Sequence, residues 1–138
     1  MNNIYVLDAC ALIALLSKET GYKNVEKIIN EAKNKQSIIK MHKVNLYEVY
    51  YHLCKLYGES SAENFLAEIK KTPIQIETEI SDEMMIKGGN LKSRYKISLA
   101  DSIGLSEALL CNGSFVTADH HELGIVEKNE IINFTWIR

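Results

Sequence analysis

Residues 4–16, IYVLDACALIALL, contain the clearest structural signal of the sequence. Its first four residues form a short apolar run of strand length, and the alanine- and leucine-rich residues 9–16 predict a helix. Asp8 is the only charged residue of the stretch, and it stands where the strand ends and the helix begins. A buried carboxylate is costly without a compensating group. In parallel α/β sheets, ligands bind at this edge, outside the carboxyl ends of the strands.

Further along the chain, short apolar runs alternate with segments of helical length. This alternation, with short connectors, predicts an α/β fold around a mostly parallel sheet. The 138 residues contain no repeat, low-complexity stretch or linker, so we expect a single domain spanning residues 1–138. The expected strands are residues 4–7, 37–41, 74–77, 115–117 and 131–137, and the expected helices are residues 9–16, 21–35, 45–57, 60–70, 81–95, 98–111 and 120–127.

Two of the expected helices have unusual composition. The helix at residues 45–57 is apolar on nearly every side, which predicts that it is deeply buried. The helix at residues 81–95 contains Gly88 and Gly89, each of which weakens a helix by about 1 kcal/mol relative to alanine.

The composition is that of an ordinary globular protein, with 46% hydrophobic and 25% charged residues. Three cysteines without a CxxC pair argue against a disulfide framework or a zinc site and favour reduced thiols. The apolar residues 6–16 lack a basic leader and are too short to span a bilayer. We therefore expect a soluble, cytoplasmic protein with no membrane association. The net charge of −2 neither supports nor excludes an RNA partner.

Three further acids stand in positions like that of Asp8. Asp119 follows an expected strand, and Asp101 and Glu48 lie in the first turns of apolar helices. Each acid alone has a capping explanation. Asp8 and Asp119 suit N-caps, while Glu48 and Asp101 suit the acidic ends of capping boxes that begin three residues earlier.

Taken together, the four acids predict one shared site. Two of them end strands at the same edge of the sheet, and the other two open helices that are too apolar to lie at the surface. Carboxylates crowded there would raise each other's pKa unless a hard cation lies among them. An all-oxygen donor set suits Mg²⁺ or Mn²⁺. Capping and metal binding are compatible, because helix N-termini favour the ionised carboxylate.

Four segments, in this order, carry a resemblance to a known family: LDACALIALLSKETG, VNLYEVYYHL, SLADSIGLSEALL and FVTADHHEL. They resemble the four motifs of PIN-domain nucleases, in particular the bacterial VapC toxins. The resemblance implies a three-layer α/β/α sandwich with a central five-stranded parallel sheet and a homodimer. It also implies a Mg²⁺-dependent endoribonuclease, the toxin of a type II toxin–antitoxin pair, with a cognate antitoxin protein as its partner.

Residue by residue, the resemblance implies catalytic and metal-ligating roles for Asp8, Glu48, Asp101 and Asp119, and it matches Thr117 to a small hydroxyl residue two positions before the last acid. Cys10 departs from the family, which usually has serine or threonine there. A thiol is a poorer hydrogen-bonding substitute, so we expect an effect on rate and not on class. A cysteine nucleophile is an alternative, but this apolar stretch offers no base to activate it.

A basic segment leads into Asp101, and it contains Lys92, Arg94 and Lys96 around Tyr95. Positive charge and an aromatic ring are what single-stranded RNA binding uses. These three basic residues and Thr117 are therefore candidate substrate contacts, although a solvated helix face explains the charges equally well. Glu122 is either a further outer acid or an ordinary first-turn helix acid.

Two alternatives differ in function. A phosphatase of the haloacid-dehalogenase type also has an aspartate after its first strand, but it needs a second aspartate where this chain has Cys10. A non-catalytic PIN-like module that binds RNA or protein would keep the fold and usually lose some of the acids. All four acids are present here, which favours the ribonuclease. Nothing in the sequence suggests an organic cofactor.

Overall fold

The computed structural model describes residues 3–138, and one parallel sheet organises this part of the chain. Its strand order is β3-β2-β1-β4-β5, and all neighbouring strands are parallel. The strands are β1 (Asn3–Leu7), β2 (Ser37–His42), β3 (Ile74–Glu77), β4 (Ser114–Thr117) and β5 (Asn133–Trp136). The prediction of an α/β fold with a mostly parallel sheet is confirmed.

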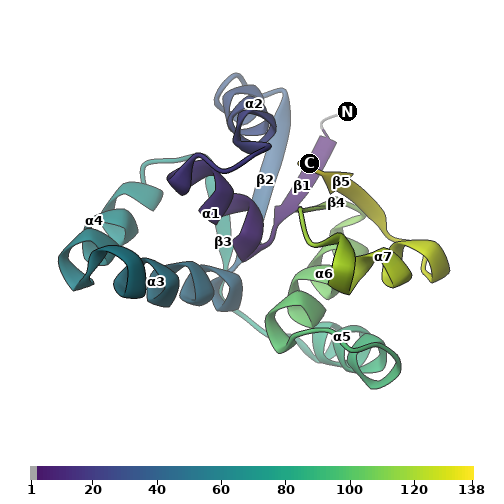
Figure 1. The fold of residues 1–138 in the computed structure, drawn as a ribbon. Helices are drawn as coiled ribbons and strands as arrows, with labels where there is room; N and C mark the ends of the chain where they lie inside the picture. Colours follow the sequence, from purple (N-terminus) through teal and green to yellow (C-terminus); the bar gives the residue numbers. More distant parts are fainter. Residues whose placement is uncertain (1–2) are drawn as a thin grey trace.

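Seven helices of the described residues connect these strands and cover both faces of the sheet. They are α1 (Ala9–Ser17), α2 (Tyr22–Lys33), α3 (Lys43–Tyr57), α4 (Glu59–Ile69), α5 (Asp82–Arg94), α6 (Leu99–Cys111) and α7 (His120–Asn129). Helices α1–α4 lie on one side of the sheet and α5–α7 on the other, which confirms the three-layer sandwich (Figure 1). None of these helices is long and apolar enough to cross a membrane.

A separate hydrophobic core lies between each face of the sheet and the helices that cover it, because successive side chains of a strand point to opposite faces. Leu7 and Val116 pack with α1–α4 in one core. Their neighbours Val6 and Phe115 pack with α5–α7 in the other. Strands buried on both faces have continuous apolar sequences, which is why the short runs at residues 4–7 and 115–117 predicted them.

Helix α3 begins earlier than the sequence predicted. It starts at Lys43 and is capped by His42, whose Nδ1 accepts a hydrogen bond from the Val44 N–H at 3.1 Å. Asn45 therefore lies inside the helix, so the capping-box explanation for Glu48 is wrong. Glu48 lies in the second turn, where an acid has no capping role.

The burial of α3 also differs from the prediction. One face of the helix is buried, but Tyr47 is 68% exposed and Leu56, Tyr51 and Tyr57 are exposed as well. The prediction of a deeply buried helix is wrong, because the apolar residues around α3 serve two surfaces. One surface packs in the core, and the other faces outward, where the rings of Tyr47 and Tyr51 pack edge to face.

Helices α5 and α6 pack closely at one of the two adjacent glycines. A Cβ atom on Gly88 would lie 2.9 Å from the Ser102 carbonyl oxygen, whereas a Cβ on Gly89 would meet nothing within 4 Å. Gly88 is buried and Gly89 is exposed. The first glycine therefore permits the helix contact, and the second only lowers the helix propensity.

Gly88→Ala should lower the free energy of unfolding by about 1–3 kcal/mol, because backbone must move to admit the methyl group. Gly89→Ala is the matched control, and it should raise the same quantity by up to about 1 kcal/mol. Urea denaturation of both variants measures the difference. Effects of equal sign at the two positions would contradict this packing.

A buried glutamate, separate from the four acids that the sequence singles out, lies on the α6 side of the sheet. Glu107 of α6 is only 6% exposed, and its Oε1 has no hydrogen-bond partner. Burial raises the pKa of Glu107 to about 7; the nearby carboxylate of Glu77 adds to this rise and the Lys40 ammonium opposes it. The ionised form of this side chain is therefore unfavourable in the fold.

The raised pKa of Glu107 makes stability fall as pH rises. An unfolded glutamate loses its proton near 4.5 and folded Glu107 near 7, so between these values the folded state holds the extra proton. The cost is absent below pH 4.5, complete above pH 7, and amounts to at most about 3 kcal/mol. Glu107→Gln should therefore be more stable than the wild type at pH 8 and equally stable at pH 4. Urea denaturation at both pH values tests this, and a stability difference independent of pH would contradict it.

Candidate metal centre

The first acid of the site is fixed by the end of β1 and the start of α1. Asp8 is 2% exposed and caps α1, since its Oδ1 accepts a hydrogen bond from the Ala11 N–H at 2.8 Å. The Asp8 N–H donates to the carbonyl oxygen of Val116 at 3.2 Å, which joins this residue to the neighbouring strand β4. The predicted N-cap is confirmed.

The second acid follows β4 in the same manner. Asp119 caps α7, and its Oδ1 accepts from the Glu122 N–H at 3.0 Å. Thr117, which is fully buried, accepts a hydrogen bond from the Asp119 N–H at 3.2 Å and also bonds to the Asp8 carboxyl group. The threonine thus contacts both acids. Its contact with substrate stays a prediction.

The third and fourth acids come from α6 and α3. Asp101 lies in the first turn of α6, where the capping hydroxyl of Ser98 accepts from its N–H at 3.0 Å. Glu48 of α3 is half-buried. Asn45 Nδ2 donates to the Ala100 carbonyl oxygen at 3.2 Å, which ties α3 to the start of α6. This bond brings the helix of Glu48 against the helix of Asp101.

Glu122 joins the four predicted acids. Carboxylate oxygens of Asp101, Asp119 and Glu122 lie within 4.8 Å of one another, close enough to share one metal ion. Glu122 also accepts a hydrogen bond from the Ser98 N–H, so it fixes α7 against the start of α6. Its spacing of three residues from Asp119 puts both on one side of the first turn of α7. The sequence alone does not decide whether Glu122 belongs to the site or is an ordinary first-turn helix acid. Its spacing from Asp119 is the sequence feature that favours a place in the site.

The acid cluster, defined as Asp8, Glu48, Asp101, Asp119 and Glu122, is electrostatically crowded. Burial raises the pKa of Asp101 to about 8, and the carboxylates of Asp8, Glu122 and Glu48 add to this rise. Burial also raises the pKa of Asp8 to about 7, against the hydrogen bonds from Thr117 and Ala11. The pKa of Glu48 is raised by burial and by Glu122. Each of these shifts is what a site without its positive charge would show.

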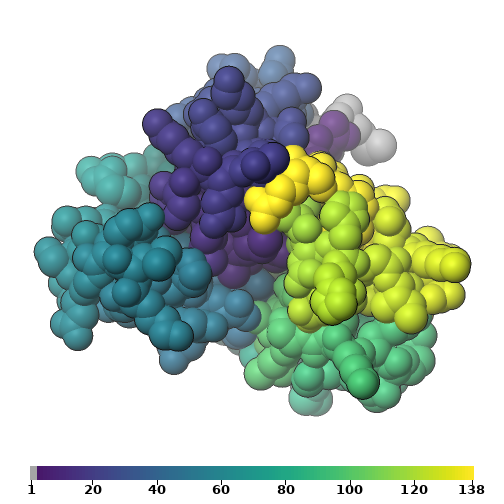
Figure 2. Space-filling view, in the orientation of Figure 1, coloured from purple at the N-terminus to yellow at the C-terminus, as the bar shows by residue number. Residues whose placement is uncertain are grey.

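No basic side chain of residues 3–138 forms an ion pair within 4.0 Å with a member of the acid cluster. The ion pairs of the described chain join Lys71 to Glu68, Arg94 to Glu130 and Arg138 to Glu19, and none includes a member of the acid cluster. In the space-filling view, a hollow separates the teal surface of α3 from the green and yellow-green surfaces of α6 and α7, with purple N-terminal residues at its base (Figure 2). The acid cluster is contributed by these same elements.

Cys10 lies beside the site as a neutral thiol. It is half-buried, and burial, with the adjacent Asp8 carboxylate, raises its pKa to about 11. A thiol with so high a pKa is a poor nucleophile near neutral pH. The alternative of a cysteine nucleophile therefore gains no support.

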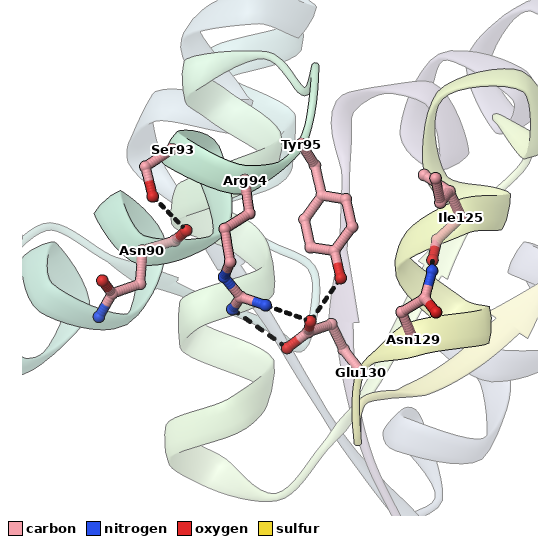
Figure 3. Close-up of polar contacts among 7 residues, drawn as sticks. All are labelled: Asn90, Ser93, Arg94, Tyr95, Ile125, Asn129 and Glu130. Atoms are coloured by element: carbon pink, nitrogen blue, oxygen red, sulfur yellow. Dashed lines mark hydrogen bonds and ion pairs between the residues drawn. The ribbon is translucent and has the colours of Figure 1, made fainter.

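The basic segment before α6 is partly engaged within the protein. Arg94 forms two hydrogen bonds to Glu130, at 2.6 and 3.3 Å, and the Tyr95 hydroxyl donates to the same carboxylate (Figure 3). Lys92 donates to the Ile97 carbonyl oxygen at 2.8 Å, and Lys96 is exposed. These contacts hold the side chains of Lys92, Arg94 and Tyr95 in place.

Arg94 and Lys96 nevertheless line a hollow next to the acid cluster. Together with Tyr95, His121 and Glu122 they line a hollow of about 470 Å³. Because Glu122 belongs to the acid cluster, this hollow opens directly beside it. Lys92 does not line the hollow, and its contact with RNA stays a prediction.

Comparison with known proteins identifies the family. The PIN domain model matches residues 5–126, and the chain therefore belongs to the PIN domain family. No match is found among the curated proteins. Membership of this family leaves the haloacid-dehalogenase alternative without support.

Several solved structures similar to this chain are VapBC complexes or VapC toxins. VapBC from Salmonella typhimurium, bound to DNA, matches with a TM-score of 0.72 at 12% identity and covers 100% of both chains. VapBC2 from Rickettsia felis, bound to a fragment of its promoter, gives 0.71 at 19% identity over 96% of this chain and 97% of that one. VapC20 from Mycobacterium tuberculosis, a toxin that cleaves the sarcin–ricin loop, gives 0.67 at 12% identity over 89% and 95%. At these identities the likeness establishes the fold.

Proposed function

We propose that this protein is a metal-dependent endoribonuclease, the toxin of a type II toxin–antitoxin pair. The observation that carries the proposal is the acid cluster. Carboxylate oxygens of Asp101, Asp119 and Glu122 lie within 4.8 Å of one another, and the charges of Asp8 and Glu48 act on the same group. Among the described residues, none of these acids forms an ion pair. A PIN-domain fold with such a cluster at the carboxyl edge of its sheet supports hydrolysis of phosphodiester bonds.

The residues of the cluster fit a divalent cation. Their donors are all carboxylate oxygens, which suit Mg²⁺ or Mn²⁺. Asp101, Asp119 and Glu122 would hold the ion together, since their carboxylate oxygens lie within 4.8 Å of one another. Asp8 is proposed as a further ligand, and Glu48 would complete the set. When bound, the metal supplies the positive charge that lowers the pKa of a water and stabilises the oxyanion of the phosphodiester.

The protein's own groups hold this site in one geometry. Hydrogen bonds from Ala11 and Thr117 fix the Asp8 carboxylate. The N-termini of α1 and α7 favour its ionised form and that of Asp119, because the helix dipole is positive there. Arg94 and Lys96, in the adjacent hollow, attract the phosphate backbone and orient it toward the acids. Lys92 and Thr117 complete the proposed substrate contacts.

The proposed biological setting follows from the relatives. Because similar chains are known in VapBC complexes, we propose a cognate antitoxin and a homodimer in the cytoplasm, with residues 1–138 as one domain. The outward face of α3 supports a protein partner, since Tyr47 and Tyr51 pack edge to face there and are both exposed.

Asp8→Asn and Asp101→Asn should each lower Mg²⁺-dependent RNA cleavage by at least about a hundredfold, since removal of even an outer partner of a metal site costs up to that much. Asparagine preserves the shape and the capping hydrogen bond, so the fold should be retained. Cleavage of an RNA panel by purified protein, with circular dichroism as the folding check, measures this. Asp82→Asn, an exposed acid on α5, is the control and should cleave as the wild type does.

Each other outcome has a definite meaning. RNA binding by the wild type without cleavage would favour the non-catalytic PIN-like module. Full activity in folded Asp8→Asn and Asp101→Asn variants would show that the acid cluster takes no part in catalysis.

A further inference from the structure

A second pocket lies on the α6 side of the sheet, at the β2–β3 edge. It has a volume of about 240 Å³. Its charged lining residues are Lys40 from β2, Glu77 and Glu79 at the end of β3, and Glu107 from α6. No residue of the acid cluster lines it, so it is a separate site.

Glu107 is the feature of this pocket that the fold does not explain. Its side chain is 94% buried, being 6% exposed, and Oε1 has no hydrogen-bond partner. Buried carboxylates are normally paired or hydrogen-bonded, because an unpaired one loses its hydration without compensation. Lys40 is the nearest basic residue of the lining, but among residues 3–138 it forms no ion pair within 4.0 Å.

The charge of the lining favours a positively charged ligand. Three carboxylates face one ammonium group, which leaves an excess of two negative charges when all are ionised. The lining also offers no set of three ligands to a metal ion, since among the described residues only Asp101, Asp119 and Glu122 bring three ligand atoms within 4.8 Å of one another. A larger cation, with N–H donors that reach acceptors about 2.8 Å away, suits this spacing better.

The remaining lining favours an alkyl chain on that cation. Met84 of α5, which is buried, and Leu110 of α6 supply apolar walls beside the carboxylates. An alkylammonium group combines donors for Glu107 and Glu77 with methylenes for these walls. We propose that this pocket binds a protonated alkyl amine through Glu107, Glu77 and Glu79. This site is independent of the proposed ribonuclease activity.

Calorimetric titration of the full chain with 1,4-diaminobutane tests the proposal, with Mg²⁺ present to occupy the acid cluster. The wild type should bind the diamine. Glu107→Gln should bind it at least about tenfold more weakly, because it removes the charge from the hydrogen bond at constant shape. Glu83→Gln, an exposed acid of α5 outside the pocket, is the matched control and should bind as the wild type does.

Two further titrations identify the ligand and guard against misfolding. The neutral isostere 1,4-butanediol should not bind. Stronger binding of Nα-acetyl-lysine amide than of the diamine would point to a lysine side chain of a partner protein, and the reverse order would point to a free diamine. Glu77→Gln repeats the test if Glu107→Gln does not fold. The proposal would be overturned if the wild type did not bind the diamine. It would also be overturned if Glu107→Gln and Glu77→Gln bound the diamine as strongly as the wild type does.

Discussion

Electrostatic repulsion among carboxylates is the constraint on which the functional edge of this protein depends. Asp8, Asp101 and Glu48 all have a raised pKa, and burial and neighbouring acids are the causes. A fold under selection for stability alone would not gather such groups at one edge. The chain tolerates them because helix N-termini and backbone N–H groups supply partial positive charge. A divalent cation would supply the rest.

The topology determines where these charges meet. Strands β1 and β4 are parallel neighbours, so the residues that follow them, Asp8 and Asp119, emerge side by side. Helices α3 and α6 then bring Glu48 and Asp101 to the same edge, held by the bond from Asn45 to the Ala100 carbonyl. The site is therefore assembled by the sheet order and not by any local sequence motif. Asp8 and Asp119 also cap their own helices, whereas α3 and α6 are capped by His42 and Ser98.

Much of this could be predicted from the sequence. The strands were recognisable because both faces of the sheet are covered, so their apolar runs are continuous. Asp8 and Asp119 were predictable because strand ends of a parallel sheet share an edge. The start and burial of α3 were not, because His42 is an unusual cap and the apolar residues of this helix serve two surfaces. The sequence does not distinguish ligation from a helical role at Glu122, since both favour an acid in a first helical turn. Glu107 gave no signal, because its burial arises from the packing of α6 on distant strands.

Anomalous X-ray diffraction from crystals soaked in Mn²⁺ tests whether these acids bind a divalent cation. We expect an anomalous peak within the acid cluster, about 2 Å from carboxylate oxygens that include one of Asp101. That peak should be absent in crystals of the Asp101→Asn variant. A well-ordered soaked crystal without a peak in the cluster, or with Mn²⁺ bound only elsewhere, would contradict the claim that these acids form a divalent-cation site.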